Sequence, residues 1–224
     1  MQFTGRTKNI IFDLDGTLVD TAQDLANALS HAVSPYERGP YGPEEIKPLV
    51  GEGLERLIAK SLGPGVLGPG AMEMDVQQAL HRFVAFYEAH LTDNTHPYEG
   101  VADTLRELKD RGLLLAVLSN KRTSMCRSIL EALGLIEFFR VVAGGDAPPE
   151  KKPSPLAALY VLEALGAVPA ESVMVGDSDI DIQTAEAAGM KSIAVTYGFR
   201  PREVLSGADH IVEGFPEILP FFEK

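Results

Sequence analysis

The chain has a single cysteine, no long apolar run and fewer basic than acidic residues. The lone Cys126 excludes a framework of disulfide bonds, and because no paired base stands near it in the sequence, we expect it to be inert packing. No apolar run approaches the roughly 20 residues that a membrane-spanning helix needs, and the first residues lack the apolar centre of a secretion signal. We therefore expect a cytoplasmic protein without membrane contact.

Acidic residues dominate the charge. The 20 Lys and Arg residues against 32 Asp and Glu residues give a formal net charge of −12. A field of this sign repels nucleic acids and anionic membranes, so neither is expected as a partner, and an anionic substrate would need local positive charge. The 224 residues, 45% of them hydrophobic, suffice for one core and a small accessory domain. The sequence does not indicate an oligomeric state.

Residues 20–94 show helical periodicity only. Apolar residues recur three or four positions apart in three segments, formed by Ala22, Leu25, Leu29 and Val33, by Leu54, Leu57 and Ile58, and by Val76, Leu80, Phe83, Tyr87 and Leu91. Breakers rich in glycine and proline separate the segments, and one of them runs from Gly63 to Gly70. This block is therefore expected to consist of helices.

From Tyr98 onward, short apolar strands alternate with helices. We expect strands at 113–118, 141–142, 173–175, 193–195 and 211–212, and helices near 100–110, 123–133, 154–165, 180–188 and 216–222. Such alternation is typical of βαβ units and a parallel sheet, to which the apolar run 9–12 would also belong. The sequence thus predicts an α/β fold. Its doubly wound parallel-sheet (Rossmann-like) core would be residues 1–19 and 95–224, with a small helical cap, residues 20–94, inserted after the first strand.

Two acidic residues directly follow the first predicted strand. Asp13 and Asp15 stand before Gly16, at the carboxyl end of the run 9–12, where doubly wound sheets keep their ligands. Adjacent carboxylates repel each other and lose solvation, so a cation, a shared proton or both must compensate. Because Asp-x-Asp also occurs at ordinary turns, this pattern alone leaves a structural role open.

Three further polar segments stand at or between later strand ends. Ser119-Asn120-Lys121 follows one strand, Gly176 through Asp181 follows another, and Lys151-Lys152-Pro153 lies between them. If the strands are parallel, these segments meet Asp13 at one edge of the sheet. Carboxylate oxygens suit a hard cation such as Mg²⁺, and a lysine with a hydroxyl suits phosphate oxygens. The set therefore favours phosphoryl chemistry.

These segments carry a resemblance to a known family. In order, Asp13-Leu14-Asp15-Gly16-Thr17, Ser119-Asn120, Lys152-Pro153 and Gly176-Asp177-Ser178-x-x-Asp181 are similar to the four motifs of the haloacid dehalogenase superfamily. The match covers essentially the whole chain, and the helical insertion resembles the small cap of that family. The resemblance implies a Mg²⁺-dependent phosphomonoester hydrolase that acts on a small phosphorylated metabolite through an aspartyl-phosphate.

The resemblance also implies roles for the acidic residues. Asp13 would be the nucleophile, and Asp15 would protonate the leaving oxygen and later take a proton from water. The Asp13 side chain, the Asp15 backbone carbonyl and Asp177 would hold Mg²⁺. Asp181 would orient metal-bound waters or the lysine of the third motif.

The remaining motif residues would contact the substrate. By the same resemblance, Ser119 and Lys152 would hold the transferring phosphoryl oxygens. Lys151 is the rival of Lys152, but the Lys-Pro pairing favours Lys152. Thr17 and Asn120, in the first two motifs, are expected to bind substrate.

Softer motifs bear on the identity of the substrate. Leu49 through Gly53, Ala143 through Asp146 and Lys152 through Pro155 resemble those of the bacterial phosphoglycolate phosphatases, which implies 2-phosphoglycolate. Its carboxylate would need a positive group from the cap, and Arg56 and Lys47 stand near the glycine loop. Each could instead be an ordinary solvated charge. We expect Arg56 to meet the carboxylate.

Other functions stay open at this point. A β-phosphoglucomutase or another small sugar-phosphate phosphatase has the same core motifs, whereas a phosphonate-cleaving relative would not need Asp15. A phosphoacceptor receiver domain also gathers Asp, Ser or Thr and Lys at strand ends, but it is a shorter signalling module without a helical insertion. The five histidines do not cluster and are expected to be structural or exposed, and Arg200 is a minor candidate for substrate contact.

Overall fold

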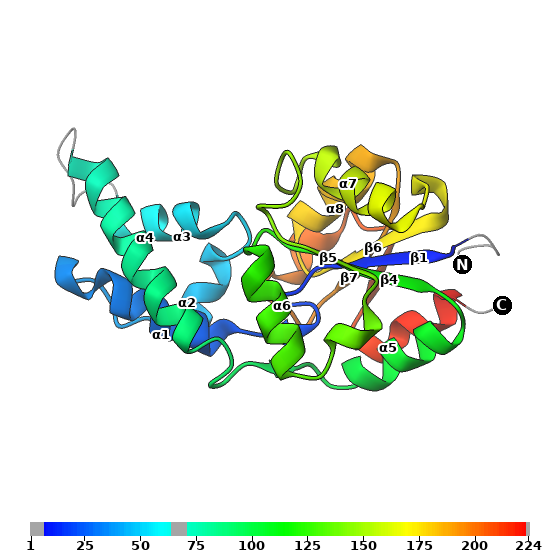
Figure 1. Cartoon of the computed structure of the whole chain (residues 1–224), viewed down its shortest axis with the longest axis horizontal. Helices are drawn as coiled ribbons and strands as arrows, with labels where there is room; N and C mark the ends of the chain where they lie inside the picture. The colour runs from blue at the N-terminus through cyan, green and yellow to red at the C-terminus, as the bar shows by residue number, and fades with distance from the viewer. Residues whose placement is uncertain (1–6, 64–70, 223–224) are drawn as a thin grey trace. The chain divides into compact units, whose positions relative to one another are not determined.

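The computed structural model describes residues 7–63 and 71–222, and the chain divides into two compact units (Figure 1). The core unit combines Met1–Asp20 with His96–Lys224, and the helical unit is Thr21–Thr95. The divisions expected from the sequence, at residues 20 and 94, lie next to these boundaries.

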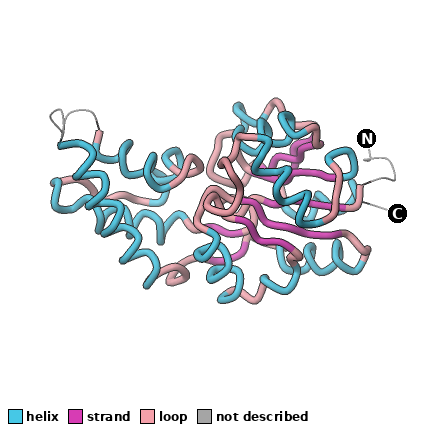
Figure 2. The backbone as a smooth tube through the Cα atoms, turned by 45° about the horizontal axis from the view of Figure 1, so that its top comes forward, coloured by secondary structure: helices cyan, strands magenta, loops and turns pink. Residues whose placement is uncertain are grey.

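A parallel sheet forms the centre of the core unit. Its strands are β1 (Asn9–Phe12), β4 (Leu114–Leu118), β5 (Val141–Ala143), β6 (Ser172–Gly176), β7 (Lys191–Val195) and β8 (His210–Val212). Within the described ranges the order is β5-β4-β1-β6-β7-β8, and every neighbouring pair is parallel. Figure 2 shows these strands side by side with helices on both faces. The predicted doubly wound sheet is therefore confirmed.

Helices cover the two faces of the sheet in separate layers. They are α5 (Val101–Asp110), α6 (Thr123–Ala132), α7 (Pro155–Leu165) and α8 (Asp179–Ala188), with 3₁₀ segments at Ile136–Phe138, Pro169–Glu171 and Arg202–Leu205. Successive side chains of a strand point to opposite faces. Ile11 accordingly packs with small residues of α7 and α8. Phe12 meets the rings of Phe139 and Phe215 on the other face, at centroid distances of 6.2 and 5.7 Å.

Helices also make up the helical unit. They are α1 (Ala22–Val33), α2 (Pro43–Ile46), α3 (Leu54–Leu62) and α4 (Ala71–Ala89), with 3₁₀ segments at Ser34–Tyr36 and Lys47–Leu49. The predicted stripe Leu25, Leu29 and Val33 is buried along α1. Leu91, which the periodicity placed in the third helical segment, lies beyond the end of α4. Of the breaker Gly63–Gly70, residues 64–70 lie outside the described residues.

A short antiparallel ribbon marks where the chain leaves and re-enters the core unit. It joins β2 (Val19–Asp20) to β3 (His96–Pro97). The sequence did not predict this ribbon, because strands of two residues are too short to show a period.

The last predicted helix differs from expectation. Residues Phe215–Phe222 form a 3₁₀ segment, η6, that contains Pro220. Proline has no N–H to donate and its ring clashes with the preceding turn, so an α-helix is disfavoured there. None of the described helices is long and apolar enough to cross a membrane.

Candidate active site

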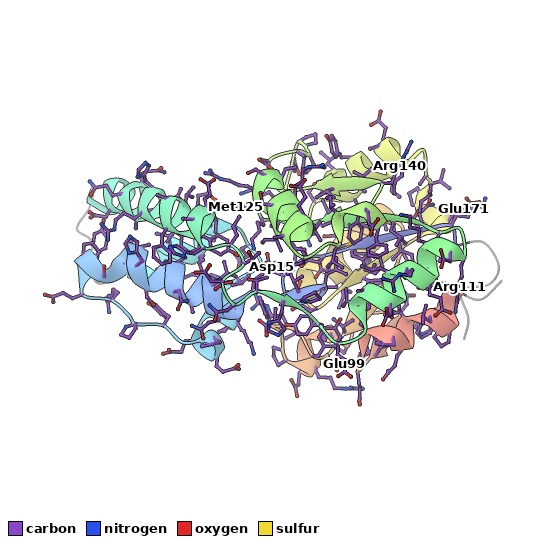
Figure 3. All side chains as sticks on the ribbon, turned by 60° about the horizontal axis from the view of Figure 1, so that its bottom comes forward. Asp15, Glu99, Arg111, Met125, Arg140 and Glu171 are labelled. Carbon is purple, nitrogen blue, oxygen red and sulfur yellow. The ribbon has the colours of Figure 1, made fainter. Side chains whose placement is uncertain are left out.

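The candidate residues gather because three neighbouring strands end level with one another. β1 pairs in register with β4 on one side and β6 on the other. The residues that follow these strands, Asp13, Ser119 and Asp177, therefore emerge at the same edge of the sheet. Figure 3 labels Asp15 at this edge and Glu171, which precedes β6, at the opposite edge.

A tight turn carries Asp13 and Asp15 away from β1. The Asp13 N–H donates to the Val175 carbonyl at 2.9 Å and so prolongs the sheet by one residue. Gly16 then adopts a φ of 84°, and a Cβ at this position would overlap the Asp177 carboxylate. Both the left-handed backbone and the close approach require glycine here.

Lys152 joins two carboxylates in the buried centre of the site. Its Nζ lies 2.9 Å from Asp13 Oδ1 and 2.6 Å from Asp181 Oδ1, and its side chain is 2% exposed. Burial lowers the pKa of Lys152, but the two carboxylates outweigh burial and hold the pKa above its usual value, so the ammonium stays charged. Lys151 is exposed. The structure thus brings Lys152, and not its rival, to the acidic residues.

Asn120 fixes the backbone that carries Lys152. The Asn120 Nδ2 donates to the Lys152 carbonyl, and its Oδ1 accepts from the Lys152 N–H, both at 2.9 Å. Two bonds from one planar amide determine the orientation of the peptide that they hold. Asn120 therefore positions Lys152, a role that its motif did not reveal, and its expected contact with substrate stays a prediction.

Asp177 sits in a close-fitting shell of backbone. The Phe199 N–H donates to Asp177 Oδ2 at 2.6 Å, and the Thr17 hydroxyl donates to Oδ1 at 3.3 Å. A Cβ on Gly198 would overlap the Asp177 side chain. Thr17, which was expected to bind substrate, is fully buried and contacts Asp177 instead. Its contact with substrate stays a prediction.

Three carboxylates approach one another closely enough to share a cation. Ligand oxygens of Asp13, Asp177 and Asp181 lie within 4.8 Å of one another. Burial, with a further contribution from the Asp181 charge, raises the pKa of Asp13 to about 7 and that of Asp177 to about 8, although Lys152 lowers both. A hard divalent cation would relieve this repulsion, and the all-oxygen donor set suits one. The described residues therefore fit a divalent metal.

Asp181 uses both of its oxygens within the protein. Oδ1 accepts from Lys152, while Oδ2 accepts from the Ser178 hydroxyl at 2.6 Å and from the Ser178 N–H at 3.2 Å. The second pair of bonds belongs to the capping box that begins α8. This geometry suits a residue that orients Lys152 more than one that binds the cation directly.

Lys121 is a second buried lysine at this edge. Its Nζ lies 2.6 Å from Asp15 Oδ1, and the two side chains are 4% and 9% exposed. Lys121 was expected at the strand end beside Ser119 and Asn120, but it lies outside the four family motifs and was given no role. Its place directly after Ser119-Asn120 was the available signal, but a lysine in a loop is ordinarily solvated.

The two basic candidates in the helical unit differ in their contacts. Lys47 pairs with Glu44 at 2.5 Å. Arg56 is exposed on α3, and with the side chains of residues 7–63 and 75–222 it enters no ion pair. Arg200, which follows β7, is half-buried.

The residues expected to be structural behave accordingly. Cys126 is fully buried on α6, and burial raises the pKa of its thiol, as befits inert packing. In the helical unit, His31 and His90 stack on the Phe86 ring at centroid distances of 4.6 and 4.3 Å.

Comparison with known proteins places the chain in one family. The sequence profile of the haloacid dehalogenase-like hydrolases matches residues 10–195. A phosphoglycolate phosphatase of Chromobacterium violaceum is 39% identical over 214 residues, which cover 94% of each chain.

Solved structures share the fold. A predicted phosphoglycolate phosphatase from Haemophilus somnus has a TM-score of 0.89 and 29% identity, covering 98% of this chain and 100% of its own. A variant of CbbY from Rhodobacter sphaeroides, in complex with xylulose-1,5-bisphosphate, has a TM-score of 0.76 and 27% identity, covering 95% and 96%. The chain therefore belongs to the haloacid dehalogenase-like hydrolase family and is a phosphatase of that family.

Proposed function

We propose that the protein is a Mg²⁺-dependent phosphomonoester hydrolase that forms an aspartyl-phosphate on Asp13 and has 2-phosphoglycolate as its substrate. The observation that carries the proposal is the Asp13 oxygen 2.9 Å from the buried Lys152 ammonium, beside the Asp177 carboxylate. A carboxylate held next to a fixed cation can attack phosphorus without first reorganising its surroundings.

The side chains of this edge divide the reaction into two displacements. In the first, an Asp13 oxygen attacks phosphorus, the bond from phosphorus to the ester oxygen breaks, and Asp15 gives a proton to the departing alkoxide. In the second, water attacks the same phosphorus, Asp15 takes a proton from that water, and Asp13 leaves as a carboxylate. Asp15 therefore ends the cycle protonated, as it began, but with a proton that comes from the water.

Lys152 and Ser119 are assigned to the transferring phosphoryl oxygens. The Lys152 ammonium is held by Asp181 and its backbone by Asn120, so its charge is fixed in place before substrate arrives. Ser119 follows β4, and its hydroxyl oxygen accepts from the Lys121 backbone N–H at 3.3 Å.

The residues assigned to Mg²⁺ are the Asp13 side chain, the Asp15 backbone carbonyl and Asp177. When bound, the ion would supply positive charge to the phosphoryl oxygens. Of the three, the Asp177 side chain is the most firmly held. Phe199 and Thr17 donate hydrogen bonds to it, and Gly16 and Gly198 pack closely against it.

The core residues would serve any phosphomonoester, so the choice of substrate rests on the relatives. The name of the Chromobacterium violaceum relative favours 2-phosphoglycolate. The Chromobacterium violaceum phosphatase is similar over nearly the full length of the chain. A second candidate, a sugar phosphate, is favoured by the likeness to CbbY bound to xylulose-1,5-bisphosphate. A mutase of the β-phosphoglucomutase type would release an isomer instead of inorganic phosphate.

A metabolite screen tests this proposal. Inorganic phosphate and isomeric products are measured for 2-phosphoglycolate, glucose 1-phosphate, xylulose-1,5-bisphosphate and p-nitrophenyl phosphate, with Mg²⁺ and with a chelator. We expect the highest kcat/KM for 2-phosphoglycolate and a fall to about 1% of turnover or less on chelation, reversed by added Mg²⁺. A higher kcat/KM for a sugar phosphate, or an isomer without phosphate release, would refute the substrate. Full turnover in chelator would refute the metal requirement.

Replacement of the nucleophile gives the second prediction. Asp13→Asn should reduce kcat by about 10⁴-fold or more, because the amide cannot form the acyl phosphate. The fold should survive, since burial already disfavours the charged form of Asp13. Far-ultraviolet circular dichroism and urea unfolding check the fold. Asp179→Asn, on the half-buried Asp179 that bonds to Gln183, is the matched control and should stay active. Turnover by Asp13→Asn at the wild-type rate would rule out the assignment.

Arg56 stays our candidate in the helical unit for contact with the substrate carboxylate. Arg56→Ala should lower kcat/KM for 2-phosphoglycolate by roughly 10-fold or more and leave p-nitrophenyl phosphate nearly unchanged, because the aryl ester lacks a carboxylate. Lys60→Ala, on the same helix and paired with Glu52, is the control. An equal loss of kcat/KM on both esters would refute the role of Arg56 in substrate specificity.

A further inference from the structure

Lys121 is a buried lysine at the edge of the sheet that carries Asp13 and Asp15, and it has no part in the two proposed displacements. The Lys121 ammonium lies 2.6 Å from Asp15 Oδ1, and its side chain is 4% exposed. Removing an ammonium group from water is costly, and proteins accept that cost where the charge is paired and used. Lys121 faces Asp15, whereas Lys152 faces Asp13 and Asp181. The two lysines therefore serve different parts of the site.

The backbone around Lys121 is held in place by a glycine turn. The Gly145 N–H donates to the Lys121 carbonyl at 2.8 Å. A Cβ on Gly144 would overlap the backbone at Lys121 and Thr123, and a Cβ on Gly145 would crowd the Asn120 carbonyl. The turn can approach this closely because both residues are glycine. The Ala143–Asp146 motif thus supports the loop that carries Lys121.

The same turn also fixes the start of α6, the helix that follows the Lys121 loop. Asp146 Oδ1 accepts from the Thr123 N–H at 2.8 Å and from its hydroxyl at 2.6 Å, at the start of α6. Because hydrogen bonds hold the loop on both sides of Lys121, the backbone from which its side chain extends is fixed in position. A charged side chain on a fixed backbone is suited to the recognition of a substrate group.

The position of Lys121 relative to Asp15 defines which part of a substrate it can meet. In the proposed mechanism, Asp15 gives its proton to the ester oxygen, so that oxygen lies in hydrogen-bond contact with Asp15, at about 2.7 Å. A cation beside Asp15 then stands next to the group attached to the ester oxygen. Lys152, beside Asp13, stands next to the phosphoryl group. The carboxylate of 2-phosphoglycolate is one carbon away from the ester oxygen.

We propose that Lys121 is a specificity residue that binds one oxygen of the carboxylate of the leaving alcohol, which leaves the other oxygen for Arg56; the assignment rests on the proposed function. An ammonium has three N–H donors, so it can bond to Asp15 and to a substrate carboxylate at the same time. The acidic field of the whole chain repels an anionic leaving group, and Lys121 supplies the local positive charge that such a group needs. The alternative is a lysine that only holds Asp15 in place.

Two alkyl esters separate these roles. Propyl phosphate has an alkoxide leaving group, as 2-phosphoglycolate does, but no carboxylate. kcat and KM are measured on both esters for the wild type, Lys121→Met and Lys121→Arg, with p-nitrophenyl phosphate as a substrate whose leaving group needs little protonation. Lys8→Met, a lysine with 67% exposure at the other edge of the sheet, is the matched control and should retain wild-type values.

We expect Lys121→Met to lose roughly 10- to 100-fold more kcat/KM on 2-phosphoglycolate than on propyl phosphate, mostly through KM. Lys121→Arg should recover most of that difference. Equal losses on both alkyl esters, with p-nitrophenyl phosphate spared, would show that Lys121 serves Asp15 alone and would overturn the proposal. Where Lys121→Met does not fold, Lys121→Gln provides the same comparison.

The wild-type enzyme separates failure of the inference from failure of the proposed function. A wild type that does not prefer 2-phosphoglycolate to propyl phosphate lacks a carboxylate site, and the proposed substrate then fails together with the role of Lys121. A wild type with that preference, retained in Lys121→Met, refutes the role of Lys121 and leaves the proposed function standing.

Discussion

The repulsion among three carboxylates gathered near the ends of β1 and β6 is the constraint on which the site depends. Asp13, Asp177 and Asp181 bring oxygens within 4.8 Å of one another, and burial raises the pKa of the first two far above their usual values. Such a cluster needs compensation by positive charge, by a bound proton or by both. Lys152 supplies part of that charge, and the oxygen-only donor set leaves a place for a divalent ion. A bound phosphate ester would add negative charge to the site, and the Lys152 ammonium and the divalent ion would have to balance that charge as well.

Rigid backbone around the acids makes this arrangement possible. The sheet aligns the ends of its strands, Gly16 and Gly198 let backbone approach Asp177, and Asn120 holds the peptide of Lys152 through two hydrogen bonds. Each contact fixes a charged group before substrate arrives, which is the condition for strong electrostatic stabilisation of a transition state. The residues expected to touch substrate are thus accompanied by others that hold them.

The sequence predicted the sheet and the edge where the acids gather because both follow from local patterns. Apolar runs mark strands, and polar residues directly after them mark the active edge. Contacts between distant segments were not predictable in this way. The bonds from Asn120 to Lys152 and from Lys121 to Asp15 join residues far apart in the chain, and a side chain's type does not reveal its partner. The helix expected at 216–222 is instead the 3₁₀ segment η6, because Pro220 disfavours an α-helix there.

The proposed mechanism requires that Asp13 becomes covalently phosphorylated during turnover. The most direct measurement is acid quenching of the enzyme during hydrolysis of ³²P-labelled 2-phosphoglycolate, followed by borohydride reduction and peptide mass analysis. An aspartyl-phosphate is reduced to homoserine, so the peptide that contains Asp13 should carry homoserine at that position, and the protein should hold label before reduction. Label on another residue, or steady turnover without any protein-bound phosphate, would contradict a mechanism through Asp13.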